Sequence, residues 1–229
     1  MTTLFVTATG TDVGKTFVTA KLVAELRAAR RSVRALKPVA SGFDAADIAA
    51  SDIGVLLDAL GLPPTAEHLD DVSPWRFAAP LSPDMAAARE RRSIPFAELV
   101  EFCRAPRPAD VTLIEGIGGV MVPLDHAHTV LDWIAELRAP VLLVAGSYLG
   151  TLSHTLTAVA ALRARGVEPI AVIVSESEQQ PVPLAETAAA IRRFVSPIAV
   201  AALPRLKTDA ASPSASAPAL LPLLAELLS

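Results

Sequence analysis

The sequence predicts an α/β fold, with a mostly parallel sheet and helices on both of its faces, formed by a single domain over residues 1–229. Apolar runs of strand length alternate with segments of helical periodicity, a pattern typical of strands buried on both faces. A length of 229 residues and a hydrophobic content of 52% suffice for one large core. In such sheets, ligands bind beyond the carboxyl ends of the strands.

A phosphate-binding loop follows the first predicted strand. Residues 4–6 are apolar, residues 7–16 read TATGTDVGKT, and a helical pattern comes next. A strand, a glycine-bearing loop and a helix in this order make the fold P-loop NTPase-like. Gly14 lets a phosphate approach the backbone, Lys15 supplies positive charge, and the Thr16 hydroxyl is a natural Mg²⁺ ligand. The loop by itself predicts nucleotide binding and no particular reaction.

The other elements follow from periodicity and from helix start and stop signals. Helices are predicted over residues 15–31, 51–61, 95–104, 130–138, 151–165 and 183–194, and strands over 32–37, 109–115, 140–145, 169–174 and 197–203. Residues 73–84, with three prolines, predict a long non-periodic connection. Residues 207–218, rich in serine, proline and alanine, are expected to be mobile, and a short helix over 220–228 to pack on the body.

Charged residues stand at the tips of two predicted buried strands. Lys37 follows Leu36, and Glu115 follows Ile114 and precedes a glycine-rich turn. A lysine at the mouth of a buried strand is unfavourable unless it meets an anion, so we expect it to face phosphates or an anionic substrate. Glu115 takes the place of a metal-binding or water-positioning carboxylate. A solvated strand end for Lys37 and a surface glutamate are the alternatives.

Several residues carry less information when taken singly. Asp52 alone indicates a helix-terminal charge. The helix that begins at Gly150 and Thr151 has free N–H groups that could hold a carboxylate. His154 is assigned no role. The single cysteine, Cys103, predicts a buried thiol in a reducing compartment.

The composition argues against nucleic-acid and membrane partners. The net charge is -4, and the basic residues form no extended surface pattern. No apolar run is long enough to span a bilayer, and the N-terminus lacks the pattern of a signal peptide. We therefore expect a cytoplasmic protein.

In order and spacing, these segments resemble the dethiobiotin synthetase family of biotin biosynthesis. The resemblance runs from the first strand to the last, and Thr9, in place of the usual loop glycine, fits the family. The motifs that carry it are Thr11-x-Val13-Gly14-Lys15-Thr16, Lys37-Pro38-Val39-x-Ser41-Gly42, Pro80-x-Ser82-Pro83, Glu115-Gly116-x-Gly118-Gly119, Asp132-Trp133 and Leu149-Gly150-Thr151-x-x-His154.

The resemblance implies an ATP-dependent ligase that needs Mg²⁺. The family forms a cyclic urea, dethiobiotin, from 7,8-diaminononanoate, CO₂ and the co-substrate ATP. The intermediates are a carbamate and a carbamic-phosphoric mixed anhydride. The resemblance also implies a homodimer.

It further implies roles for individual residues. Lys15, Lys37, Thr11 and Ser41 would be catalytic, and Thr16, Asp52 and Glu115 would bind Mg²⁺. Nucleotide contacts are implied for Asp12, Val13, Gly14, Lys15, Thr16, Phe17, Asp52, Glu115, Gly116, Ile117, Gly118, Ser175, Glu176, Pro204, Arg205 and Leu206. Substrate contacts are implied for Lys37, Ser41, Gly118, Gly150, Thr151 and Ser153. Four positions depart from the family pattern. Asp12 stands where a glutamate or glycine is common, Gly10 replaces an acidic or other residue of the loop, and Ser175 and Ser153 replace frequent asparagines.

Two other functions fit the same fold. One is a nucleotide-dependent switch of the partition or septum-positioning type, and the other is a different ATP-dependent synthetase. Switch proteins of that type carry a second lysine early in the loop, where Thr9-Gly10-Thr11 stand here, and often end in a basic helix, whereas the only charge in residues 220–228 is Glu226. Lys37-Pro38-Val39 with Ser41 argues against a different synthetase.

Overall fold

The computed structural model describes residues 2–105, 108–205 and 218–228. The elements in chain order are β1 (Thr2–Ala8), α1 (Lys15–Ala28), β2 (Val33–Leu36), β3 (Val39–Ser41), the 3₁₀ turn η1 (Ile48–Ala50), α2 (Asp52–Leu60), α3 (Ala66–Val72), β4 (Trp75–Phe77), α4 (Pro83–Arg89), α5 (Phe96–Arg104), β5 (Val111–Glu115), α6 (Val130–Leu137), β6 (Val141–Ala145), α7 (Thr151–Ala164), β7 (Pro169–Ser175), α8 (Leu184–Val195), β8 (Ala199–Leu203), the 3₁₀ turn η2 (Leu221–Leu224) and α9 (Ala225–Leu228).

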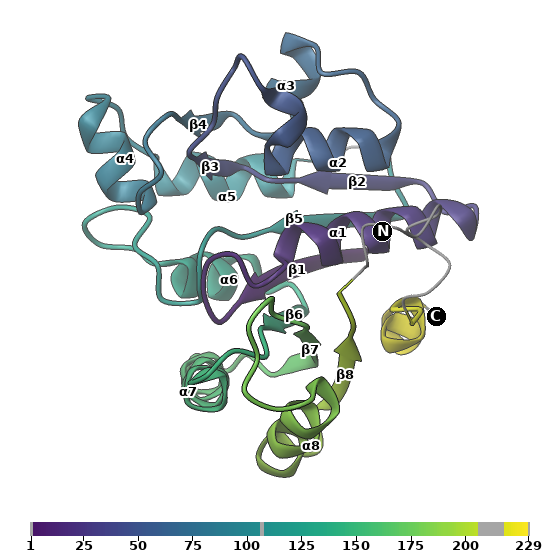
Figure 1. The fold of residues 1–229 in the computed structure, drawn as a ribbon. Coiled ribbons are helices and arrows are strands. Elements are labelled where there is room, and N and C mark those ends of the chain that lie inside the picture. Colours follow the sequence, from purple (N-terminus) through teal and green to yellow (C-terminus); the bar gives the residue numbers. More distant parts are fainter. Residues whose placement is uncertain (1, 106–107, 206–217, 229) are drawn as a thin grey trace.

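Six strands form one parallel sheet in the order β2-β5-β1-β6-β7-β8, with helices on both sides (Figure 1). Side chains alternate between the two faces along each strand. Phe5 of β1 joins the core under α5, α6, α7 and α8, whereas Leu4 and Val6 join the core under α1. The predicted parallel sheet with both faces covered is confirmed.

Helix boundaries follow their capping signals. Helix α2 begins after Ser51, whose Oγ accepts the N–H of Gly54 at 3.1 Å, and ends before Gly61 in the left-handed conformation. Helix α1 was predicted to run to residue 31 but ends at Ala28. Arg30 takes a positive φ of 58°, which a continuing helix does not allow.

The prediction for residues 73–84 is wrong in part. Strand β4 pairs with β3 in a small parallel sheet, and α4 begins at Pro83. A three-residue strand is too short to show an alternating pattern, and its only partner lies more than thirty residues earlier in the chain. The small sheet of β3 and β4 lies beside the carboxyl end of β2 (Figure 1).

The C-terminal segment packs on the body, as expected, but begins as η2 and not as a regular helix. Leu220 and Leu224 are buried in the core under α1. The carboxylate of Glu25 accepts the backbone N–H groups of Leu220 and Leu221 at 2.9 and 2.7 Å.

Of the segment predicted to be mobile, residues 207–217 lie outside the described part of the chain. Within the described ranges, no helix has both the length and the apolar character needed to cross a membrane.

We predict that Glu25→Ala lowers the free energy of unfolding by about 2 kcal/mol, because it leaves two backbone N–H groups of η2 without their charged acceptor. Urea unfolding measures this change, and amide hydrogen exchange should locate it at Leu220 and Leu221. Lys21→Ala is the control, since it removes the ion pair with Glu25 at 2.9 Å and leaves the Glu25 carboxylate in place. That control should cost at most about 1 kcal/mol. Unchanged protection of both amides in Glu25→Ala would contradict the prediction.

Candidate active site

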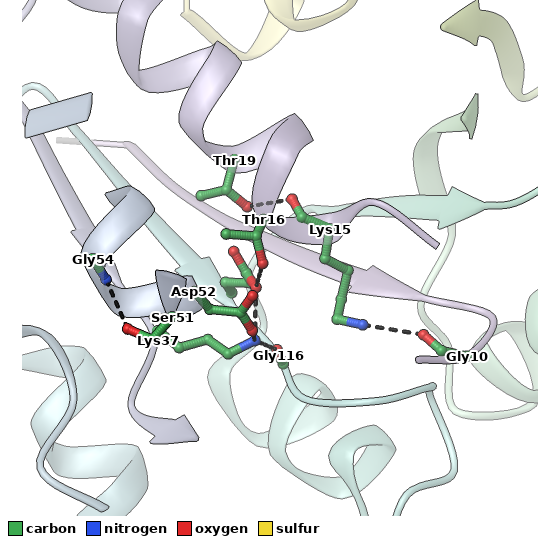
Figure 2. Close-up of polar contacts among 10 residues, drawn as sticks. Gly10, Lys15, Thr16, Thr19, Lys37, Ser51, Asp52, Gly54 and Gly116 are labelled. Carbon is green, nitrogen blue, oxygen red and sulfur yellow. Dashed lines mark hydrogen bonds and ion pairs between the residues drawn. The ribbon is translucent and has the colours of Figure 1, made fainter. Parts of the chain in front are cut away.

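The phosphate-binding loop joins β1 to α1 with two residues in the left-handed conformation. Asp12 has φ of 55° and Gly14 has φ of 96°. A Cβ atom at Gly14 would lie 2.8 Å from the Ser175 Oγ, so the position requires glycine on both grounds. Lys15 opens α1, and its Nζ donates to the Gly10 carbonyl across the loop at 3.0 Å (Figure 2). The loop is therefore curled around the start of the helix, as an anion site needs.

A cavity of about 820 Å³ opens above this loop, at the carboxyl ends of β1, β2 and β5. Five segments line it: the phosphate loop, the stretch from Lys37 through β3, the start of α2, the connection to α4, and the turn after β5. Their residues include Thr11, Asp12, Gly14, Lys15, Thr16, Phe17, Lys37, Ser41, Asp52, Ser82, Ile117 and Gly118. The volume and the mixture of charged, hydroxyl and apolar groups suit a nucleotide together with a second small molecule.

Lys37 and Glu115 meet because β2 and β5 are neighbours in the sheet. Leu36 pairs with Ile114, so the next residue of each strand emerges at the same edge. The Lys37 Nζ lies 2.6 Å from the Glu115 Oε1 and 3.1 Å from the Gly116 carbonyl. Both side chains are almost completely buried, with 3% and 0% exposed. The alternatives of a solvated strand end and a surface glutamate are therefore wrong.

Asp52 and Thr16 complete this cluster. The Asp52 Oδ2 lies 3.0 Å from the Lys37 Nζ, and the Thr16 Oγ1 donates to the Glu115 Oε1 at 2.8 Å. Figure 2 shows Lys37, Asp52 and Thr16 converging beside the start of α1. Asp52 reaches the cluster because the Ser51 cap fixes the first turn of α2. Asp52 is thus a charge in the first turn of α2, as the sequence indicates, and it also pairs with Lys37.

The charges in the cluster shift one another's pKa. Burial alone would lower the pKa of Lys37, but the carboxylates of Glu115 and Asp52 outweigh it and raise this pKa above its ordinary value. Desolvation would raise the pKa of Asp52, but Lys37 and a hydrogen bond from Thr16 hold it below its usual range. Burial, followed by the nearby charge of Lys37, lowers the pKa of Lys15 to about 8.

The oxygen atoms around Lys37 fit a hard divalent cation. The Glu115 Oε2 is buried without a hydrogen-bond partner, and the Thr16 hydroxyl and the Asp52 carboxylate lie beside the same carboxyl group. Mg²⁺ in nucleotide sites takes one or two carboxylates, a hydroxyl and phosphate oxygens. Among the described residues, no group of three or more His, Cys, Asp or Glu side chains is arranged to hold a metal, so phosphate and hydroxyl oxygens would have to complete the set.

Sequence reasoning assigned no role to Ser82, although it quoted the surrounding motif. Ser82 lines the cavity, and its Oγ is buried with no hydrogen-bond partner. It precedes α4 without capping it, so the hydroxyl remains available to a ligand. Its position between Pro80 and Pro83 was the feature of the sequence that could have indicated a role for Ser82. Val13, in contrast, packs its side chain into the core under α1.

Gly116, Ser175, Glu176, Pro204 and Arg205 are nucleotide candidates that do not line the cavity. Ser175 contacts the Gly14 position. The Glu176 carboxylate accepts the Arg205 backbone N–H at 2.9 Å and the Gln180 amide at 2.7 Å, which ties the ends of β7 and β8 together. Pro204 adjoins this contact, and Leu206 falls outside the described residues.

The candidates at the start of α7 also stand apart from the cavity. The hydroxyl of the buried Thr151 donates to the Gly146 carbonyl at 2.7 Å, and the Thr151 backbone N–H donates to the Tyr148 carbonyl. Gly150 has φ of 99°, and Ser153 is exposed on the first turn. Within one chain, these three residues and the cluster around Lys37 therefore form separate groups.

Cys103 is the buried thiol that the sequence predicts, and burial raises its pKa to about 12. We expect Ellman's reagent at pH 8 to react with the folded protein about a thousandfold more slowly than with a free cysteine, because the thiolate is correspondingly rare. In guanidinium chloride the single thiol should react at the ordinary rate. Rapid labelling of the native protein would show that the thiol is accessible, contrary to this expectation.

The comparisons with known proteins agree with this geometry. The family model described as AAA domain matches residues 2–211. The ATP-dependent dethiobiotin synthetase BioD of Acidiphilium cryptum (strain JF-5) is 52% identical over 198 residues, which cover 85% of this chain and 89% of that protein. The protein of the same name from Methylobacterium nodulans (strain LMG 21967 / CNCM I-2342 / ORS 2060) is 52% identical over 200 residues, which cover 84% of this chain and 89% of that protein.

The fold has counterparts among solved structures. The signal recognition particle receptor FtsY of Elizabethkingia anophelis aligns with a TM-score of 0.51 and 14% identity, over 100% of this chain and 65% of the receptor chain. At this identity the likeness shows the fold alone. It agrees with the predicted P-loop NTPase-like class.

Proposed function

The chain belongs to the ATP-dependent dethiobiotin synthetase family, and we propose that it forms dethiobiotin from 7,8-diaminononanoate, CO₂ and ATP. The observation that carries the proposal is the buried ammonium of Lys37, which lies beside the phosphate loop and lines the same cavity. One positive charge at this point can serve both an acidic substrate group and a transferred phosphoryl group.

The proposed chemistry needs charge neutralisation and alignment more than a strong base. One amine of the substrate adds CO₂ to give a carbamate, which takes the γ-phosphoryl group of ATP. The second amine then attacks the carbonyl carbon of the mixed anhydride, and inorganic phosphate leaves. Lys37 stabilises the carbamate and the anhydride, and Lys15 stabilises the transferring phosphoryl group. Thr11 and Ser41, which both line the cavity, contact the substrate and orient it.

Thr16, Asp52 and Glu115 are the proposed Mg²⁺ ligands. Their support is the unpartnered Glu115 Oε2 and the placement of the two other groups beside it. When bound, Mg²⁺ would neutralise phosphate charge during the transfer. Asp12 to Phe17 and Gly116 to Gly118 are proposed to hold the phosphates through backbone and side-chain groups.

The base and the substrate tail are proposed to lie outside the cavity of one chain. Ser175, Glu176, Pro204, Arg205 and Leu206 are proposed to face the nucleotide base, and the approach of Ser175 to Gly14 of the phosphate loop supports this placement. Gly150, Thr151 and Ser153 are proposed to hold the distal carboxylate at the interface of a homodimer. The exposed Leu149 and Leu152 support a contact at that face, with 83% and 41% of their surface accessible.

We further propose that residues 1–229 form one domain that works in the cytoplasm. All of the larger described helices pack on the one six-stranded sheet, which supports a single domain. The single cysteine supports a reducing compartment.

The test is phosphate release from ATP with Mg²⁺ and bicarbonate, with and without 7,8-diaminononanoate, together with mass spectrometry of the product. Release that depends on the diamine, with a product of the mass of dethiobiotin, would establish the reaction. Hydrolysis that ignores the diamine and rises with a partner protein or a lipid would favour the switch alternative. Diamine-independent release that another acid stimulates would favour a different synthetase.

A further inference from the structure

The ammonium of Lys37 lies at the point where the proposed metal ligands converge. Its Nζ is 2.6 Å from the Glu115 Oε1 and 3.0 Å from the Asp52 Oδ2. The Thr16 Oγ1 donates to the same Glu115 oxygen at 2.8 Å. The Glu115 Oε1 thus accepts from both a lysine and the hydroxyl of the phosphate loop, while the Oε2 of the same carboxylate has no partner. A divalent cation would use oxygens of these same two carboxylates.

Two cations cannot share this position. A bound Mg²⁺ requires oxygen ligands at about 2.1 Å in a nearly octahedral arrangement. An ammonium held between the Glu115 and Asp52 carboxylates would stand only a few ångströms from an ion bound to the same two groups, in a buried site where repulsion is weakly screened. The Thr16 hydroxyl would also have to turn its proton away from Glu115 in order to bind a metal.

From this conflict, and resting on the proposed function, we infer that Lys37 and the divalent cation exchange on the Asp52–Glu115 pair. The lysine holds the two carboxylates together until the cation binds, and cation binding then releases the ammonium toward the substrate. Lys37 lines the same cavity as Ser41, so its flexible stem can turn from the carboxylates toward a molecule bound there. The Gly116 carbonyl, 3.1 Å from the Nζ, provides a neutral partner during the change.

This exchange imposes an order on the site. The charge that recognises the carbamate becomes available only after the metal and its nucleotide are in place. An acidic molecule that enters first meets a lysine that two carboxylates already neutralise. The site is therefore selective for a complete set of reactants.

The exchange predicts that removal of the ammonium strengthens cation binding. In Lys37→Met, Mn²⁺ without nucleotide should bind about tenfold more tightly than in the unmodified protein, because the carboxylates keep their charge and lose their competitor. Electron paramagnetic resonance of free Mn²⁺ measures this affinity directly. Lys21→Met is the matched control, since it removes a lysine ion-paired at 2.9 Å outside the site, and it should change the affinity less than twofold. An affinity in Lys37→Met that rises less than threefold, or falls, would overturn the inference.

A second measurement uses the unmodified chain and does not depend on the folding of a variant. Brief acetylation followed by peptide mapping reports the accessibility of each lysine. Saturating Mg²⁺ should raise the labelling of Lys37 several-fold and leave that of Lys21 unchanged. Equal labelling of Lys37 with and without Mg²⁺ would contradict the exchange. Neither measurement involves turnover, so the two proposals can fail separately. Dethiobiotin formation without exchange of Lys37 and the cation would contradict only this inference. Exchange without dethiobiotin formation would contradict only the proposed function.

Discussion

Lys37→Ala should reduce the rate of dethiobiotin formation by about a thousandfold, while the protein stays folded. The loss is of the size seen when a preorganised group that stabilises developing charge is removed from an enzyme. Lys37 qualifies as such a group because its 3%-exposed side chain is held in place by three oxygen atoms. Steady-state phosphate release at saturating ATP and diamine measures the effect, and circular dichroism checks the fold.

The control for this variant is Lys21→Ala, whose lysine lies on α1 outside the cavity. It should keep its turnover within twofold of the unmodified enzyme. The rate of Lys37→Ala should not recover when the diamine concentration is raised, because the lost interaction belongs to the transition state. A turnover within tenfold of the unmodified enzyme would remove Lys37 from the catalytic role.

Glu115→Gln should lower the free energy of unfolding by about 3 kcal/mol, in addition to abolishing turnover. The substitution leaves the buried ammonium of Lys37 with only Asp52, whose side chain is 51% exposed, as a charged partner. Breaking a buried ion pair by removing one partner is strongly destabilising, since the remaining charge is desolvated without compensation. Urea unfolding at pH 7.5 with an unchanged m-value measures the loss.

The pH of that measurement matters. Because the pKa of Lys37 is raised in the fold, its contribution to stability is fully present below the unfolded pKa of about 10.4. It is lost only as the pH rises through the folded pKa. The pKa of Asp52 is lowered, so its contribution is present above the unfolded pKa of about 3.9 and is lost as the pH falls through the folded value. At pH 7.5 both groups are charged.

Two further variants separate the ion pair from general effects of substitution. The double variant Lys37→Met/Glu115→Leu should recover most of the stability lost in Glu115→Gln, because no charge is left stranded. Glu136→Gln should change stability by less than about 1 kcal/mol, because its ion pair with Arg104 is half exposed on both sides. A loss as large in Glu136→Gln as in Glu115→Gln would contradict the explanation through burial.

Local signals in the sequence were sufficient for most of the fold. The predicted buried strands are present, with ends that shift by one to two residues. Ser51, Gly61 and Thr129 stand at or next to the predicted ends of α2 and α6. The missed elements include β3, β4, α3 and α4. They are short, and β4 is a strand only because it pairs with β3. A pairing between distant segments does not produce a periodic pattern of apolar residues in either segment.

The same division applies to the site. The sequence alone determined the phosphate loop, the strand-tip positions of Lys37 and Glu115, and the covered parallel sheet, because loop geometry and apolar periodicity are properties of neighbouring residues. Only the tertiary structure decided that Lys37 and Glu115, 78 residues apart, form a buried ion pair that Asp52 joins. That outcome depends on the placement of β2 beside β5, which is set by the burial of whole faces of the sheet and not by any one segment.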